Sequence, residues 1–402
     1  MKSFKEIEKE AKSCKNKARK KALEILLALA EIYEAEKFIE IDSVQISGVS
    51  YKNIGDAGLE FLRNLSKEDA KVVVKEATLN PCGIDLELWK SLGIPEKFAK
   101  KQIEILNCFK RMGIKATCSC VPYLIGNKPK KFQSIAWSES SAVCFANSVL
   151  AARTNRESGI SALCSGLTGI TPLYGYHLEV NRMPTHLIKV ECPLKGVSDF
   201  SALGYFIAKK ISRGVPYFSG IKASNFDELK ALSAALATSG SVAMFHVHDL
   251  TPEAKTRELR DHCKKTLKVK SLRKAYKELN SRVKRIDLVA IGCPHLSINE
   301  IKEISLLLKG EKLETRLWLF TSRKIKERAG KYIRVIEKSG AKVLADTCIV
   351  VMPIEYLNIK TIATNSGKAA FYLPSYAKVK VRFGSLESCI NAAINGIWKD
   401  ET

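Results

Sequence analysis

The sequence has no uncharged apolar stretch of about 18 or more residues, which argues against a membrane-spanning helix. Its N-terminus, Met-Lys-Ser-Phe-Lys-Glu-Ile-Glu-Lys-Glu, alternates in charge and lacks the apolar core of a secretory signal. The twelve cysteines show no framework of short regular spacings, and 402 residues are far too many for a disulfide scaffold. We therefore expect a cytoplasmic protein with reduced thiols.

The sequence also lacks the usual features of nucleic-acid-binding proteins, although its formal net charge is +24. It has no zinc-finger spacing, no RGG-like repeat and no tract in which aromatic and basic residues alternate. The densest basic run, Lys255 to Arg285, carries apolar residues at helical spacing, which is typical of a solvated helix face. A basic nucleic-acid-binding protein is an alternative, but scattered charge fits better with attraction of small anionic substrates.

The spacing of apolar residues predicts an α/β protein. Helices are expected over 19–33, 57–65, 96–112, 299–308 and 322–339. Strands are expected over 38–41, 71–78, 114–121, 241–248, 286–291, 316–320 and 342–352. Because strands and helices alternate after residue 71, we predict α/β layers with largely parallel sheets.

No long repeat or low-complexity linker marks a domain boundary in this chain. Its length and 46% hydrophobic content are enough for a large core divided among two or three domains. We expect a helical segment over 1–70 and α/β units over 71–200 and 201–345. The C-terminal segment, 346–402, should pack back on the core.

The most unusual segment is 135–156, where polar side chains interrupt an apolar helical frame. An unpaired buried polar group costs about 1–3 kcal/mol, so these residues need hydrogen bonds to each other or to a ligand. Two interpretations are open, a buried network where helices pack and the wall of a polar active site. The polar residues are Glu139, Ser140, Ser141, Asn147, Arg153, Asn155 and Arg156.

Two further polar segments are candidates for ligand binding. The loop 47–56 contains two glycines and several hydroxyls, which indicates either close approach to a ligand or a plain turn into the next helix. The segment 364–374 begins Thr-Asn-Ser-Gly-Lys, a suitable cradle for a carboxylate or a phosphate. It lacks the spacing of a Walker loop, and a capped helix start with a solvated lysine is the alternative interpretation.

Cysteines follow predicted strands on three separate segments. Cys118 and Cys120 end one strand, Cys293 lies between Gly and Pro in a turn, and Cys348 is near the C-terminus. Iron–sulfur clusters need thiolate ligands but no fixed spacing, so convergence of three cysteines on one cluster is a hypothesis. Zinc is disfavoured because no C-x₂-C or H-x₃-H pair is present. A Cys293–His295 nucleophilic pair is also disfavoured, because residues two apart in a turn seldom face each other.

Six motifs in consistent order resemble the aconitase X family, and the resemblance runs from about residue 20 to the C-terminus. The motifs are Ser-Gly-Val-Ser-Tyr-Lys-Asn-Ile-Gly-Asp-Ala-Gly (47–58), Thr-Leu-Asn-Pro-Cys-Gly-Ile-Asp (78–85), Thr-Cys-Ser-Cys-Val-Pro-Tyr-Leu (117–124), Ala-Trp-Ser-Glu-Ser-Ser-Ala-Val-Cys-Phe-Ala-Asn-Ser-Val-Leu (136–150), Gly-Cys-Pro-His-Leu-Ser (292–297) and Asn-Ser-Gly-Lys (365–368). The resemblance implies an aconitase-like fold of three-layer α/β/α domains around a central iron–sulfur site. It also implies that the mobile fourth domain is a separate small subunit.

The activity implied by the resemblance is that of a hydro-lyase, with this chain as the catalytic large subunit. The substrate implied is (R)-5-phosphomevalonate, dehydrated to trans-anhydromevalonate 5-phosphate in the archaeal mevalonate pathway. Bacterial relatives dehydrate cis-3-hydroxy-L-proline, which is the alternative substrate. The cofactor implied is an iron–sulfur cluster of the [4Fe-4S] type, whose open iron acts as a Lewis acid.

The resemblance also implies which residues form the site. Cys120, Cys293 and Cys348 are the implied cluster ligands; Cys120 is preferred over Cys118 because the family places a cysteine two residues before Pro-Tyr. No general base is assigned, since the small subunit is a candidate to carry it. The implied substrate-binding residues are Ser47, Gly48, Val49, Ser50, Asn80, Pro81, Glu139, Ser140, Asn147, Arg153, Thr154, Asn365, Ser366 and Lys368.

The chain departs from related patterns in two places. Conventional aconitases pair two cluster ligands as C-x-x-C, and this chain has no such pair. Many aconitase X sequences carry Gly-Glu just before the Ile-Ala-Trp stretch, where this chain has Lys131-Phe-Gln-Ser134. The second departure leaves the choice of substrate more open.

Overall fold

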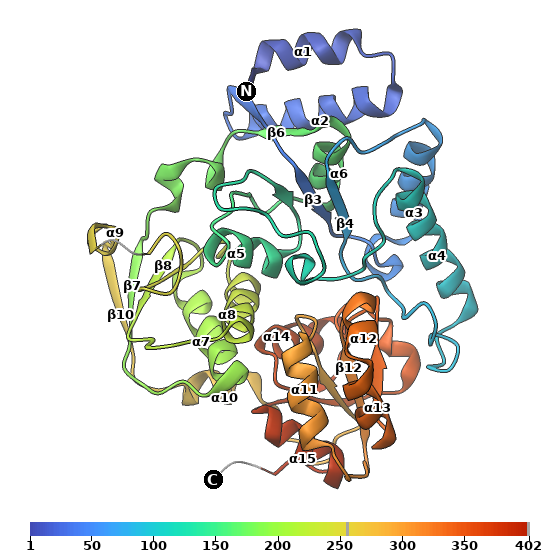
Figure 1. The fold of residues 1–402 in the computed structure, drawn as a ribbon, viewed down its shortest axis with the longest axis vertical. Helices are drawn as coiled ribbons and strands as arrows, with labels where there is room; N and C mark the ends of the chain where they lie inside the picture. Colours follow the sequence, from blue (N-terminus) through green and yellow to red (C-terminus); the bar gives the residue numbers. More distant parts are fainter. Residues whose placement is uncertain (255–256, 400–402) are drawn as a thin grey trace.

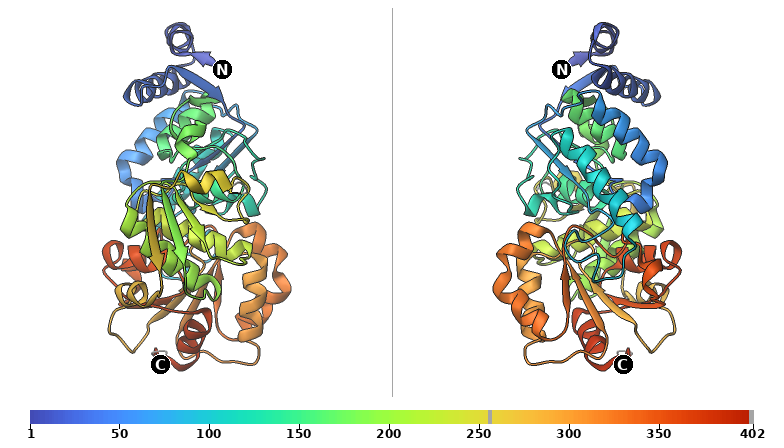
Figure 2. Two further views of the ribbon diagram at one scale, coloured as in Figure 1. Left: turned by 90° about the vertical axis from the view of Figure 1, so that its left-hand side faces the viewer. Right: turned by 90° about the vertical axis from the view of Figure 1, so that its right-hand side faces the viewer.

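The computed structural model describes residues 1–254 and 257–399. The N-terminal helices lie at one end of the molecule and the C-terminal sheet at the other (Figures 1 and 2). Within the described residues, the strands form four sheets. No helix among them is both long and apolar enough to span a membrane.

Two sheets form the N-terminal unit. A small antiparallel sheet joins β1 (Lys2–Ser3), β2 (Lys37–Glu40) and β6 (Ile170–Pro172), beside α1 (Phe4–Ser13) and α2 (Lys17–Ile32). A parallel sheet has the order β4-β3-β5, with β3 at Ser43–Ile46, β4 at Glu76–Leu79 and β5 at Ala136–Trp137. Its associated helices are α3 (Tyr51–Lys67), α4 (Glu96–Arg111), α5 (Ser140–Ser148) and α6 (Gly159–Thr168).

The strands of this parallel sheet position three candidate segments. The loop 47–50 follows β3, Asn80 follows β4, and Glu139 lies two residues after β5. Carboxyl ends of parallel strands share one edge of a sheet, which is where α/β proteins place ligands. The fold therefore brings these predicted segments to one edge.

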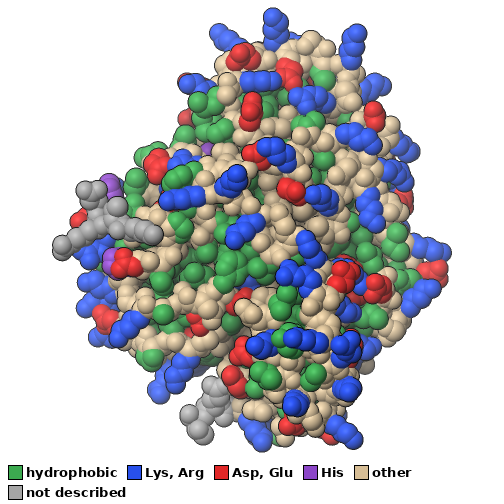
Figure 3. Space-filling view, viewed as in Figure 1, with side chains coloured by type: hydrophobic (Ala, Val, Ile, Leu, Met, Phe, Trp, Pro, Cys, Tyr) green, Lys and Arg blue, Asp and Glu red, His purple; other side chains and the backbone are tan. Residues whose placement is uncertain are grey.

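A middle unit has a parallel sheet in the order β10-β7-β8-β9. Its strands are β7 (His186–Val190), β8 (Pro216–Ser219), β9 (His246–Val247) and β10 (Lys265–Val269). Helices α7 (Gly196–Ile211) and α8 (Phe226–Ser239) pack together, and α8 also contacts α5. The predicted basic run is divided among α9 (Arg257–Asp261), β10 and α10 (Arg273–Leu279), while residues 255–256 lie outside the described part. Lys and Arg side chains are spread over the whole face in Figure 3.

The C-terminal unit is a five-stranded parallel sheet in the order β13-β12-β11-β14-β15. Its strands are β11 (Leu288–Ile291), β12 (Arg316–Phe320), β13 (Lys342–Leu344), β14 (Thr361–Thr364) and β15 (Lys380–Phe383). Its helices are α11 (Ile298–Leu307), α12 (Arg323–Arg328), α13 (Gly330–Lys338), α14 (Gly367–Tyr376) and α15 (Leu386–Asn395).

Two hydrophobic cores cover the two faces of this sheet. Val289 and Ile291 join a core with α11, α13 and α15, whereas Leu288 and Ala290 join the main core with α14. Successive strand residues point to opposite faces, so the alternation makes a three-layer α/β/α arrangement. The predicted α/β class with largely parallel sheets is confirmed.

Several predicted elements differ from those observed. The helices at 19–33 and 96–112 and the strand at 316–320 are confirmed. The strand predicted over 114–121 is wrong, since only Lys115 forms an isolated bridge and the backbone at Cys118 turns away with φ 44°. The strands predicted over 241–248 and 342–352 are reduced to β9 and β13, because buried loops occupy the rest.

The sheets also group the chain differently from the domain boundaries expected near 70, 200 and 345. Residue 200 lies within α7, and residue 345 follows β13 inside the five-stranded sheet. The unit that contains β3 and β4 continues across residue 70.

Glycine at position 292 is required by the turn that carries Cys293. Its φ is 109°, and a Cβ there would lie 2.2 Å from the Phe320 carbonyl oxygen. Gly310 also has a positive φ, 84°, but has nothing within 4 Å of the same position. Substitution of Gly310 therefore tests backbone strain alone, whereas substitution of Gly292 tests backbone strain together with a steric clash.

We expect Gly310→Ala to lower the free energy of unfolding by about 1–2 kcal/mol through its backbone conformation alone. Gly292→Ala should cost about 1–3 kcal/mol more, because the added methyl group displaces the β12 backbone. Urea unfolding followed by circular dichroism measures both values. Equal losses for the two variants would contradict the clash.

Candidate functional site

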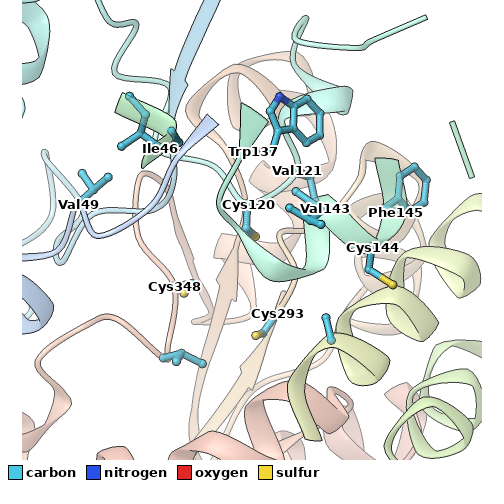
Figure 4. Packing of buried hydrophobic residues seen from close by; sticks show 14 of the residues in the cluster. Ile46, Val49, Cys120, Val121, Trp137, Val143, Cys144, Phe145, Cys293 and Cys348 are labelled. Carbon is cyan, nitrogen blue, oxygen red and sulfur yellow. The ribbon is translucent and has the colours of Figure 1, made fainter. Parts of the chain in front are cut away.

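The three predicted cysteine ligands lie on segments from two units. Cys120 follows the short bridge beside β4, Cys293 follows β11, and Cys348 follows β13. Each is less than 10% exposed. In Figure 4 their sulfur atoms turn toward one region between the three segments, whereas the sulfur of Cys144 on α5 points away.

The electrostatics of these thiols agree with this arrangement. Burial raises the pKa of the Cys293 thiol to about 12, an effect that Lys368 opposes and Cys348 reinforces. Burial also raises the pKa of Cys120, with Glu139 and Cys348 adding to the effect and Lys368 opposing it. The thiols therefore share one electrostatic environment with a lysine and a glutamate.

Cys118 has different neighbours from Cys120. Its pKa is raised first by a hydrogen bond with Cys82 and then by burial, so its thiol faces Cys82. The Cys120 sulfur accepts the backbone N–H of His295 at 3.2 Å. The geometry therefore groups Cys120, not Cys118, with the segment that carries Cys293.

A buried ion pair joins the two polar motifs. Lys368 Nζ donates to the Glu139 carboxylate and, at 2.6 Å, to Ser141 Oγ. Glu139 also accepts the N–H of Ala142 at 2.6 Å as the N-cap of α5. Burial disfavours ionisation of Glu139, but Lys368 and these hydrogen bonds outweigh it and lower the pKa of the carboxyl.

The Asn-Ser-Gly-Lys motif begins α14 beside the Cys293 turn. Ser366 caps the helix by accepting the N–H of Ala369 at 3.1 Å, and its hydroxyl donates to the Cys293 carbonyl. Gly367 N–H donates to Ser201 Oγ at 2.7 Å. The alternative interpretation of this motif is correct for the capped helix but wrong for the lysine, because only 12% of the Lys368 side chain is exposed and it pairs with Glu139.

The loop 47–50 is held on both sides. Ser47 N–H donates to Ser138 Oγ at 2.6 Å, and Ser50 Oγ donates to the Val351 carbonyl at 3.0 Å. Gly48 has φ 73°, a conformation that favours glycine. Val49 is buried between them. The loop therefore contacts both the Glu139 segment and the Cys348 segment.

Asn80 and Pro81 lie beside that loop. Asn80 N–H donates to the Ile46 carbonyl at 2.9 Å, whereas its Oδ1 is buried without a hydrogen-bond partner in the described part of the chain. A buried carbonyl oxygen without a donor is costly, so a ligand that donates there would stabilise the site. The next residue but one, Cys82, donates its N–H to Asp346.

Gln102 is a residue of this region that the sequence interpretation missed. Its Oε1 accepts the N–H groups of Tyr51 and Gly83 at 2.8 and 2.9 Å, and its Nε2 donates to the Val49 carbonyl at 2.9 Å. The signal was present in the sequence. Gln102 occupies the buried stripe of α4, where Phe98, Ile105 and similar residues predict an apolar side chain.

Asn147, Arg153 and Thr154 belong to a different hydrogen-bond network. Asn147 bonds to Thr154, to the Ala243 carbonyl and to Arg182, and Arg153 bonds to Glu179 and to the His177 carbonyl. Asn147 lies about 12 Å along α5 from Glu139, given the 1.5 Å rise per residue. Protein partners hold these three residues, and their role in substrate binding stays a prediction.

Ser140 and Asn365 are the last two of the predicted substrate-binding residues. Ser140 is partly exposed in the first turn of α5, next to Glu139. Asn365 lines a cavity of about 640 Å³ together with acidic residues such as Asp227 and Glu300. It also lines the small gap beside Cys293.

Cysteine thiolates are the donors that an iron–sulfur cluster requires. No three His, Cys, Asp or Glu side chains of the described residues lie close enough together to hold one metal ion. A cluster offers a separate iron to each thiolate, so its ligands need not meet at one point. Three buried, unpaired cysteines on separate segments meet that requirement.

Comparisons with known proteins agree along the chain. Family models for the first, second and third domains of aconitase X match residues 3–180, 184–282 and 286–395. The crystal structure of Thermococcus kodakaraensis aconitase X in its holo-form is similar, with a TM-score of 0.90 and 43% identity. The match covers 98% of this chain and 100% of that chain.

Two named enzymes illustrate the range of relatives. The phosphomevalonate dehydratase large subunit of Methanocaldococcus jannaschii is 49% identical, over 92% of this chain and 94% of that protein. The cis-3-hydroxy-L-proline dehydratase of Pseudomonas aeruginosa is 35% identical, over 94% of this chain and 67% of that protein.

We expect Lys368→Met to lower the free energy of unfolding by about 3–5 kcal/mol, because it leaves Glu139 buried without its cation. Lys115→Met is the control: it breaks a 2.8 Å ion pair with Glu76 at the surface and should cost less than about 1 kcal/mol. Since the folded pKa of Glu139 is lowered, its contribution is lost as the pH falls below its ordinary value of 4.5. Urea unfolding should therefore show the difference between wild type and Lys368→Met narrowing as the pH falls toward and below 4.5, because the unpaired Glu139 of the variant takes up its proton first. A constant difference would contradict the ionised pair.

Proposed function

The chain belongs to the aconitase X family, and on that premise we propose that it is the large subunit of a phosphomevalonate dehydratase, a hydro-lyase. Four relatives with that name match at 44–49% identity over nearly their whole length and a fifth matches at 32%, whereas two hydroxyproline dehydratases match at 33–35% over about two thirds of theirs. The structural observation that carries the proposal is the grouping of Cys120, Cys293 and Cys348 beside the Glu139–Lys368 pair.

Cys120, Cys293 and Cys348 would hold the iron–sulfur cluster of this enzyme, for which we propose the [4Fe-4S] type. When bound, the cluster supplies a Lewis acid that assists departure of the substrate hydroxyl group. The thiols must be reduced to bind iron, and Cys120, Cys293 and Cys348 are free thiols. This supports the cytoplasm as the location of the enzyme.

The remaining site residues bind and orient the substrate. Lys368 and Ser366 hold an anionic end, because a buried ammonium group and a helix N-terminus both favour negative charge. Glu139 keeps Lys368 in place and charged. Asn80 offers its free Oδ1 to a substrate hydroxyl, and the loop 47–50 with Pro81 forms the wall beside it. Ser140 and Asn365 extend the site on either side.

The proposed enzyme needs a second chain. The relatives named as large subunits imply a small subunit, and this chain spans 94% of one of them but 67% of a hydroxyproline dehydratase. We propose that this small subunit is the swivel domain and is a candidate to carry the general base. On the face shown in Figure 3, Lys and Arg side chains are spread out rather than gathered into one patch.

The proposed reaction predicts a new phosphorus signal. Phosphorus NMR of (R)-5-phosphomevalonate with the anaerobically reconstituted complex should show a shifted resonance, because dehydration changes the carbon chain that bears the phosphate. Visible absorption of the cluster in the same sample shows that the enzyme is intact. No change from a coloured complex would reject this substrate and favour 3-hydroxyproline, to be tested in the same sample.

Replacing any one of Cys120, Cys293 or Cys348 with Ser should abolish most of the visible absorption after anaerobic reconstitution, because a ligand thiolate is lost. Cys118→Ser and Cys144→Ser are matched controls, since both thiols are buried but face other groups. Both controls should keep wild-type iron content. Loss of iron in Cys118→Ser with retention in Cys120→Ser would reverse the ligand assignment.

A further inference from the structure

His295 contacts all three segments that carry the cysteine ligands. It is fully buried two residues after Cys293. Its backbone N–H donates to Cys120 Sγ at 3.2 Å. Its ring nitrogens bond to Ser119 Oγ at 3.2 Å and to the Thr347 carbonyl at 2.9 Å. Ser119 and Thr347 each adjoin a predicted ligand, so one side chain spans all three.

The partners of the ring determine where its proton lies. The Thr347 carbonyl can only accept, so Nε2 carries the hydrogen and donates it. In the neutral ring Nδ1 is then an acceptor, and the Ser119 hydroxyl donates to it. Ser119 Oγ in turn accepts the N–H of Val121 at 3.2 Å. The result is a directional chain of hydrogen bonds from the Cys120 segment through the ring to the Cys348 segment.

A lysine of the middle unit binds the backbone carbonyl of His295. Lys230 Nζ donates to the His295 carbonyl at 3.2 Å, and Lys230 itself is buried between Asp227 and Glu300. The N–H, the carbonyl and both ring nitrogens of His295 are thus all used. A buried residue with every polar group engaged on different segments fixes the distances between them.

We propose that His295 is the positioning residue of the cysteine cluster, which holds the Cys120, Cys293 and Cys348 segments in register. This inference deepens the proposed function, because the segments that it aligns carry the proposed cluster ligands. Its effect on the loops themselves does not require iron. The alignment can therefore be tested with and without the cofactor.

The first test is amide hydrogen exchange of the cluster-free full chain, read by mass spectrometry over 117–124 and 345–352. His295→Leu removes both ring hydrogen bonds, so exchange in both segments should be about tenfold faster than in wild type. His177→Leu is the matched control, since His177 is equally buried but neither ring nitrogen has a partner among the described residues. It should leave both segments unchanged.

Conservative variants separate positioning from simple packing. The amide of Gln reaches the place of Nε2, so His295→Gln should restore slow exchange over 345–352 and leave 117–124 fast. The shorter His295→Asn reaches the place of Nδ1 and should give the opposite pattern. Equal behaviour of both variants in both segments, or no change in His295→Leu, would overturn the proposal.

Ser119→Ala is a second variant that can be measured if His295→Leu fails to fold. It leaves His295 in place and removes both the donor to Nδ1 and the acceptor of the Val121 N–H, so exchange should become faster over 117–124, at residues other than Val121 as well, and stay unchanged over 345–352. Unchanged exchange there would also count against His295.

The second test follows the cluster in the reconstituted complex. After addition of an iron chelator, visible absorption should decay about 10–100-fold faster in His295→Leu than in His177→Leu, as expected when a residue behind the ligands is lost. Equal decay would overturn the proposal. A wild-type complex that never takes up iron would reject the proposed function, while the exchange measurements would still decide the role of His295.

Discussion

Burial of the Glu139–Lys368 ion pair is the constraint on which the site depends. Removing both charges from water is costly, and the cost is offset only when each charge keeps partners in fixed positions. Glu139 begins α5 in the N-terminal unit, and Lys368 lies in the first turn of α14 in the C-terminal unit. The two units therefore cannot shift past each other without leaving a buried charge unpaired. The ion pair also lies close to the cysteines, because Glu139 and Lys368 both shift the pKa values of Cys120 and Cys293. The contact that fixes the two units therefore also fixes the surroundings of these thiols.

The site forms where segments from two parallel sheets meet. Loops at strand ends have no ladder hydrogen bonds, so their backbone groups need other partners. Here they find them across the boundary between units, as Ser50 donates to the Val351 carbonyl and Cys82 to that of Asp346. Each contact joins a loop of the β3–β4 sheet to the segment around Cys348. The same hydrogen bonds that satisfy the loops thus also assemble the site.

Sequence patterns predict those parts of the structure whose burial is periodic. The helix at 19–33 and the strand at 316–320 repeat apolar residues at regular spacing, and both were predictable. The segment 114–121 also carries apolar residues but forms a loop, in which the N–H groups of Lys115 and Ser119 donate to the Ala77 and Leu79 carbonyls outside a regular ladder. His295 illustrates the same limit in the site: its N–H bonds to a sulfur 175 positions away. Motif resemblance could suggest which cysteines converge, but not which residue aligns them.

The polar segment 135–156 shows why its two interpretations could not be separated from the sequence. At one end of α5, Glu139 meets Lys368 beside the cysteines; at the other, Asn147 meets Thr154 and Arg182 in a packing network. Both kinds of residue are buried, polar and hydrogen-bonded, so their cost of burial is the same in kind. Only their partners differ. Because a helix of nine residues reaches from one environment to the other, a single segment serves both the proposed site and the core.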